Sequence, residues 1–360
     1  MTALHLRQPA LTLKAGYRAL QRLREAPLTP ADVHVIPGAA GGPKALGLTG
    51  LDKAVFGQWL PRVPQQRALI GSSIGSWRFA AVASSDDPAV QLERLAELYI
   101  SQRFDRGVTA EEVTRKSDEF LASLLAGREQ QVLDHPWYRL GILVVRSHGR
   151  LADDRRGRLL TGLAQVVAAN LAGRRHLGRF MDRGLVQDPR SPVPLADLTD
   201  FPTHRIELTA ENLRPALLAS ASIPLVMSGV RDLPGAPAGV YRDGGLLDYH
   251  LDLPYQQPGI VLFPHFTDRV VPGWFDKALR WRKGTAEHLK DVLLVAPSPE
   301  YLAALPDGKL PDRRDFERYA GNDAGRERAW RRAVAESERL GEAFLEGLET
   351  GRLMDWVQPL

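Results

Sequence analysis

Two apolar strands that run directly into glycines constrain the fold of this chain more than any other feature. Residues 33–37 (VHVIP) are followed by GAAGG, and residues 67–71 (RALIG) end in the first glycine of GSSIG. Helical spacing of apolar residues follows each glycine turn, over 44–59 and from about Ile74. A strand, a tight turn and a helix, twice within 50 residues, predict an α/β sheet covered by helices.

The rest of the chain extends this pattern. We expect further helices over 88–104, 110–126 and 157–180, and further strands over 140–147, 204–208, 259–264 and 291–297. The pattern also predicts one amphipathic helix over Pro9–Ala26, a proline-rich surface loop over 184–202 and charged helices from about residue 312. The predicted fold is a three-layer α/β/α sandwich with a mostly parallel central sheet. Its expected parts are an N-terminal helix (1–29), the main domain (30–310) and a C-terminal helical extension (311–360).

Composition excludes several classes of protein. The 360 residues contain no cysteine, which rules out disulfides, thiolate catalysis and cysteine zinc sites. The sequence has no uninterrupted apolar run of membrane-spanning length, and Arg7, Lys14 and Arg18 interrupt the N-terminus before the apolar core of a secretory signal develops. The net charge of +4 is small for a nucleic-acid-binding protein. We therefore expect a cytoplasmic protein without a nucleic-acid partner and leave a peripheral membrane location open. The sequence gives no indication of the oligomeric state.

The motif Gly71-Ser72-Ser73-Ile74-Gly75 matches the G-x-S-x-G of serine hydrolases. Such chemistry needs a serine on a strained turn between a strand and a helix, where Gly71 and Gly75 would relieve the crowding. The N-terminus of the following helix would direct N–H groups at the developing oxyanion. Without its setting the pentapeptide is weak evidence, and a purely structural glycine-serine turn is the alternative.

Three other segments could contribute to a site. The loop GAAGGPKALGL (38–48) matches neither the nucleotide phosphate loop nor the dinucleotide fingerprint, so an oxyanion hole or a simple tight turn remains. In VYRDGGLLDYH (240–250), Asp243 stands at an expected strand end, where Gly244 and Gly245 would let another loop come close. The segment LLASASIPLV (217–226) by itself indicates only a helix end or a turn.

In this order, GGPK, GSSIG, ASASIP and DGG closely resemble the motifs of the patatin-like phospholipase family, over about residues 30–265. The resemblance implies that Ser73 attacks the ester, that Asp243 is its base in a Ser–Asp dyad, and that the glycine loop holds the oxyanion. It implies no cofactor.

The glycine loop departs from the family pattern G-G-G-x-[RK]-G. Ala40 and Ala45 replace the first and last glycines, and Pro43 has no N–H to donate. The donors we expect are therefore the backbone N–H groups at the positions that remain and at the residue after the nucleophile, namely Gly41, Gly42, Lys44 and Ile74. This departure puts the depth of the oxyanion hole, and with it the rate, in question.

Two alternatives to the dyad enzyme stay open. His250 and His265 follow Asp243, so a soluble carboxylesterase or thioesterase with a Ser-His-Asp triad is formally available. A weakly active lipid-binding or regulatory protein of the same fold is the other. No spacing of His, Asp or Glu indicates a metal site.

Two basic clusters bear on where a lipid substrate would be found. One comprises Arg174, Arg175, His176 and Arg179, and the other comprises Arg280, Arg282 and Lys283. They are interpreted either as solvated helix surface or as contacts to an anionic membrane. Together with the resemblance, the second interpretation predicts hydrolysis of a phospholipid or lysophospholipid at a membrane surface.

Overall fold

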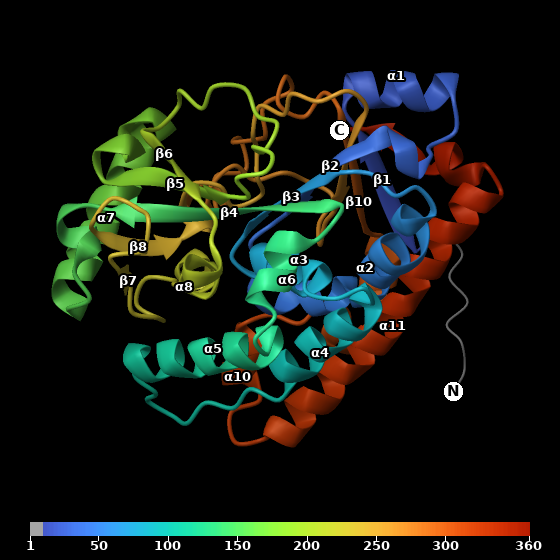
Figure 1. The fold of residues 1–360 in the computed structure, drawn as a ribbon. Helices are drawn as coiled ribbons and strands as arrows, with labels where there is room; N and C mark the ends of the chain where they lie inside the picture. Colours follow the sequence, from blue (N-terminus) through green and yellow to red (C-terminus); the bar gives the residue numbers. More distant parts are fainter. Residues whose placement is uncertain (1–9) are drawn as a thin grey trace.

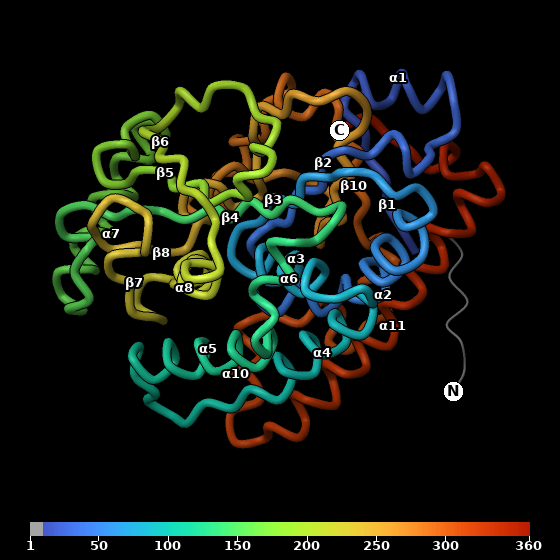
Figure 2. The backbone as a smooth tube through the Cα atoms, viewed as in Figure 1, coloured from blue at the N-terminus to red at the C-terminus, as the bar shows by residue number. Residues whose placement is uncertain are grey.

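A mostly parallel sheet forms the centre of the computed structural model, which describes residues 10–360. The main strand order is β11-β1-β10-β9-β2-β3-β4-β5-β6, and β8 pairs with β4 and with β7. Helices lie on both faces, as Figures 1 and 2 show. The strands are β1 Leu11–Ala15, β2 Val33–Gly38, β3 Arg67–Ser72, β4 Tyr138–Ser147, β5 Met181–Gln187, β6 Thr203–Glu207, β7 Val230–Arg231, β8 Val240–Asp243, β9 Ile260–Pro264, β10 Val292–Pro297 and β11 Val357–Pro359.

The helices confirm the alternation of strands and helices predicted from the sequence. The α-helices are α1 Tyr17–Glu25, α2 Thr49–Asp52, α3 Ile74–Ala83, α4 Pro88–Ile100, α5 Ala110–Leu125, α6 Glu129–Asp134, α7 Arg156–Ala172, α8 Ala210–Ala221, α9 Pro299–Ala304, α10 Arg314–Arg318 and α11 Asp323–Glu349. Shorter helical turns include η2 Gly42–Leu48, η6 Arg174–Arg179 and η8 Trp274–Asp276. The helices predicted over 88–104 and 110–126 correspond to α4 and α5. The helix predicted over 44–59 is made of the 3₁₀ turn η2, the short α2 and a π-helical stretch, and the one predicted over 157–180 is α7, which Gly173 separates from the 3₁₀ turn η6.

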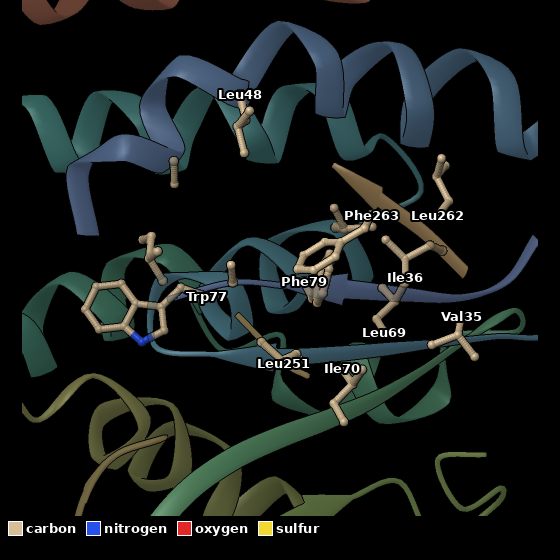
Figure 3. Packing of buried hydrophobic residues seen from close by; sticks show 14 of the residues in the cluster. Val35, Ile36, Leu48, Leu69, Ile70, Trp77, Phe79, Leu251, Leu262 and Phe263 are labelled. Carbon is tan, nitrogen blue, oxygen red and sulfur yellow. The ribbon is translucent and has the colours of Figure 1, made fainter. Parts of the chain in front are cut away.

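The parallel centre explains the continuous apolar runs of the sequence. Every residue of β3, β9 and β10 is buried, because helices cover both faces of these strands. Figure 3 shows side chains of the core on the strands and on the neighbouring helices, among them Leu48, Phe79 and Phe263. This core holds the carboxyl ends of β2 and β3 in register, with Gly38 opposite Gly71.

Two predictions of local structure are wrong. Leu11–Ala15, inside the helix predicted over Pro9–Ala26, is strand β1, because its side chains are buried at every second residue and it pairs with β10. Pro9 lies outside the described residues, and only Tyr17–Glu25 is helical. The first residues of the loop predicted over 184–202 belong to β5, which is buried throughout and pairs with β4 ahead of the prolines.

The C-terminal part of the chain packs along the α/β core. Helix α11, red in Figure 1, runs beside α2 and α4. The contact with α2 is close, since a Cβ on Gly50 would lie 2.3 Å from the backbone oxygen of Ser337. Strand β11 then joins the sheet beside β1. The predicted domain boundaries, at residues 29 and 310, stay predictions.

Candidate active site

Ser73 lies on the turn between β3 and α3, in a conformation that is strained for a residue with a side chain. Its φ of 55° and ψ of −127° lie outside the regions that such residues favour. The Ser73 backbone N–H donates to the Ser220 hydroxyl at 2.8 Å, and that hydroxyl donates to the Leu143 carbonyl at 2.7 Å. The turn is thus held from both the sheet and helix α8.

The two glycines of GSSIG allow backbone segments to touch. A Cβ on Gly75 would lie 1.9 Å from the Gly38 carbonyl oxygen, and one on Gly71 would lie 2.4 Å from the Ser76 nitrogen. No side chain fits in either place. The glycines therefore let α3 start directly against β2 and β3, which puts Ser73 beside the loop that follows β2.

Asp243, the last residue of β8, lies beside Ser73. Its side chain is buried, accepts the Gly245 N–H at 2.7 Å and forms a hydrogen bond with Ser73. The Asp243 backbone N–H donates to the Ser222 carbonyl at 3.1 Å. Gly244 is also sterically required, because a Cβ there would lie 2.2 Å from the Leu143 oxygen.

Burial determines the chemistry of the Asp243 carboxyl. It raises the pKa of Asp243 to about 6, although the nearby Arg313 guanidinium, the Gly245 N–H and the Ser73 hydroxyl each favour the charged form and act in the opposite direction. A carboxylate with this pKa is a stronger base than a solvated aspartate and is still ionised at neutral pH. It is therefore suited to accept the proton of a serine hydroxyl.

The glycine loop lies across from this pair. Gly41, Gly42 and Lys44 line a cavity together with Ser73 and Asp243. The Ala40 N–H is already used, because it donates to the Tyr249 carbonyl at 2.9 Å. Ile74 is the first residue of α3, so its N–H has no partner within the helix.

Two cavities meet at Ser73. The first, which we call the basic cavity, has a volume of about 420 Å³ and contains four cationic side chains: Lys44, Lys277, Arg313 and Arg314. The second, the apolar cavity, has a volume of about 340 Å³ and is lined mainly by Ile74, Trp77, Tyr99, Phe104, Val108, Val113, Val226, Met227 and Phe316. Gly42, Ile223 and Arg313 border both cavities, as Ser73 does. A molecule reacting at Ser73 can thus extend into two chemically different spaces.

Neither candidate histidine reaches this site. His250 and His265 are buried, and their rings lie 4.3 Å apart against Phe266. Each Nδ1 is engaged by nearby backbone groups, and neither residue lines the cavities at Ser73. Burial lowers the pKa of His265 to about 3 and that of His250 well below its usual value. Within residues 10–360, no group of three or more potential ligands is placed to hold a metal ion.

The site residues predicted from the sequence lie together around Ser73, and the structure brings further residues to the same place. Ser220 and Ser222 come from the segment that by itself indicated only a helix end. Their hydrogen-bond partners lie far away in the sequence, so the spacing of residues could not indicate them. Arg313 and Lys277 come from regions where the sequence shows only a general excess of charge. Arg313 Nε would lie 3.0 Å from a Cβ on Gly42, which itself has a φ of +57°.

Comparison with known families identifies a large part of this chain. A family model described as "Patatin-like phospholipase" matches residues 57–250. The matched region includes Ser73, Ser220 and Asp243, whereas the glycine loop and all four cations of the basic cavity lie outside it. No curated protein matches the sequence.

Proposed function

Because this chain belongs to the patatin-like phospholipase family, whose members act on lipids as acyl hydrolases, we propose that it cleaves a carboxylic ester of a phospholipid or lysophospholipid through a Ser73–Asp243 dyad. One observation carries the proposal. A serine on a strained turn is hydrogen-bonded to a buried carboxylate whose pKa burial raises to about 6. This pairing supports a mechanism in which Asp243 activates Ser73 directly, without a histidine.

The dyad would act in two half-reactions. Asp243 accepts the Ser73 hydroxyl proton while Oγ attacks the ester carbonyl, and it returns that proton to the departing alcohol as the acyl-enzyme forms. Water then attacks the acyl-enzyme, giving its proton to the same carboxylate, which passes it back to Ser73 as the fatty acid leaves. Backbone N–H groups of Gly41, Gly42, Lys44 and Ile74 are our candidates for the oxyanion hole, where one donor contributes about 3 kcal/mol.

A serine-directed fluorophosphonate probe tests the nucleophile. We expect it to label Ser73 in the wild type and to leave Ser73→Ala unlabelled. Ser73→Ala and Asp243→Asn should each lose nearly all hydrolysis of a short-chain nitrophenyl ester, and the double variant should be no worse, since the two residues act as a unit. Ser101→Ala, at the end of α4, is the control. Labelling at another serine, or substantial turnover by Asp243→Asn, would contradict the dyad.

We further propose that the substrate is presented by a membrane. On α7, Leu160, Val167 and Leu171 are 45%, 45% and 59% exposed, and their spacing places them on one helix face. Leu163 of the same helix lines the basic cavity. Trp281, 72% exposed, adds a large apolar side chain on the loop that follows η8. An exposed apolar face beside a lipase cavity suits insertion into a lipid surface.

The basic clusters contribute only part of their charge to such a surface. Arg174 and Arg282 both form ion pairs with the buried Asp276, at 2.6 and 2.9 Å, and Arg282 also donates to the Asn170 side chain of α7 at 2.9 Å. Arg175, Arg179, Arg280 and Lys283 are exposed. In the part of the chain that the structure describes, no helix is both long and apolar enough to cross a bilayer.

Sedimentation with neutral and anionic vesicles tests the membrane proposal. We expect binding to anionic vesicles that weakens as salt rises, because cations near such a surface contribute about 1 kcal/mol each over a Debye length. Replacing Leu160, Val167 and Leu171 by serine should reduce binding, whereas Val90→Ser, an equally exposed apolar position on α4, should not. A protein that ignores both vesicle types but cleaves soluble esters would instead be a soluble esterase.

A further inference from the structure

The basic cavity gathers four cationic side chains that form no ion pair within the described part of the chain. Among residues 10–360, none of these four (Lys44, Lys277, Arg313 and Arg314) lies within 4 Å of a carboxylate oxygen in an ion pair. By contrast, the buried Arg78, Arg183 and Arg242 each form an ion pair with a carboxylate. Of the described residues that line this cavity, two are carboxylates, Asp243 and Asp312.

The two carboxylates offset the four cations only in part. Asp243 forms hydrogen bonds with Ser73 and the Gly245 N–H, and Asp312 forms an ion pair with Lys309 at 3.0 Å, outside the cavity lining. Asp312 also accepts the Arg314 backbone N–H at 2.8 Å. The positive groups also repel one another: burial and then the nearby Lys277 lower the pKa of Lys44 to about 8, and burial, followed by Arg313 and Arg314, lowers the pKa of Lys277.

The cations come from three separate parts of the fold. Lys44 lies on η2, Lys277 directly follows η8, and Arg313 and Arg314 stand at the start of α10. Aromatic rings hold the two lysines in place, since Lys44 Nζ lies 4.7 Å from the Phe266 ring centre and Lys277 Nζ lies 5.0 Å from that of Tyr249. Arg313 forms a hydrogen bond with Tyr99. Like charges brought together by distant segments favour a bound anion.

The two cavities define the orientation in which a lipid ester would bind. With its ester at Ser73, the acyl chain fits the apolar cavity, where Trp77, Phe104 and Met227 lie. The alcohol side of the same ester then enters the basic cavity. Resting on the proposed hydrolase function, we infer that the basic cavity is an anion site for the leaving group, and that the enzyme selects lipids whose head group is acidic, such as phosphatidylglycerol. A zwitterionic head group would bring its own cation toward Lys277 and Arg314.

Soluble short-chain lipids test this preference without a membrane. Dihexanoyl phosphatidylglycerol and dihexanoyl phosphatidylcholine, both below their micellar concentrations, have the same acyl chains and differ in the head group. We expect a kcat/KM ratio of about ten or more in favour of the anionic lipid, and we expect Lys277→Gln with Arg314→Gln to bring it toward one, as two partly exposed charge pairs would. Arg24→Gln with Arg328→Gln, exposed cations that line neither cavity at Ser73, is the matched control and should retain the ratio.

Two further measurements separate the possible failures. Calorimetric titration of Ser73→Ala with the same lipids should show tighter binding of the anionic one, whether or not the wild type hydrolyses either, so failure of the proposed function remains distinguishable. Inorganic phosphate should inhibit hydrolysis of the anionic lipid competitively. Equal kcat/KM and equal binding for both lipids would overturn the inference. Phosphate inhibition with equal lipid selectivity would also overturn it, because the site would then serve a free anion instead of a head group.

Discussion

The Ser220 hydroxyl accepts the backbone N–H of Ser73 at 2.8 Å and donates to the Leu143 carbonyl at 2.7 Å. Two residues further along, the Ser222 carbonyl accepts the Asp243 N–H. The end of α8 therefore ties the proposed nucleophile, its base and strand β4 together. We expect this segment to position the two proposed reacting residues, because it bonds their backbone N–H groups and not their reacting side chains.

Ser220→Ala should impair turnover without changing substrate affinity. It leaves the buried Ser73 N–H and the Leu143 carbonyl without their shared partner, which costs about 1–3 kcal/mol of stability. Loss of the exact turn geometry should lower kcat by about 10- to 100-fold at nearly constant KM. Ser84→Ala is the matched control, because Ser84 is equally buried and its hydroxyl bonds the Ala81 carbonyl within α3. An unchanged kcat in a less stable protein would assign Ser220 a purely structural role.

The pH dependence of hydrolysis should report the Asp243 carboxyl. A general base must be deprotonated, and burial raises the pKa of Asp243 to about 6, so kcat/KM on an uncharged ester should rise with pH through a midpoint near that value. Arg313→Gln removes a cation that favours the carboxylate, so the midpoint should move to higher pH. Arg318→Gln, on the same short helix but outside both cavities, should leave it in place. A midpoint near 4 in the wild type, or no shift in Arg313→Gln, would contradict this assignment.

The strained backbone at Ser73 should lower the free energy of unfolding of the protein. A residue with a side chain at φ 55° and ψ −127° costs about 1–3 kcal/mol that glycine avoids. Ser73→Gly should therefore be more stable toward urea than Ser73→Ala by about 1 kcal/mol, with both variants inactive. The neighbouring Ser72 lies within β3, so Ser72→Gly should instead be destabilising. If Ser73→Gly were less stable than Ser73→Ala, the turn would not store strain.

Substitution of the buried histidines should spare catalysis. Neither His250 nor His265 lines the cavities at Ser73, so glutamine at either position, or at both, should leave kcat within about tenfold of the wild type, less than loss of a general base brings. Because both side chains are buried, circular dichroism must first show that the variants fold. A folded variant with activity as low as that of Ser73→Ala would support the Ser-His-Asp triad instead.

Local patterns in the sequence were sufficient to predict the central part of the fold. Apolar runs that end in glycine correspond to β2 and β3, and the G-x-S-x-G turn lies where the strand meets α3. These features can be recognised locally. A tight turn requires glycine at its own positions, and a strand covered on both faces requires apolar side chains along its own length. The same local reasoning misassigned Leu11–Ala15, since a short amphipathic stretch next to a helix shows the strand period over only a few residues.

Contacts between distant segments decided the rest, and no spacing along the chain encodes them. The Arg313 side chain lies against Gly42, a residue 271 positions earlier, only because α10 and α11 pack on the core. The sequence likewise could not separate Arg174 and Arg282, which both pair with Asp276, from the exposed cations beside them. Local residue types determined which groups could react. Only tertiary packing determined which of them are buried, paired or left charged beside Ser73, because burial and pairing are properties of neighbours in space.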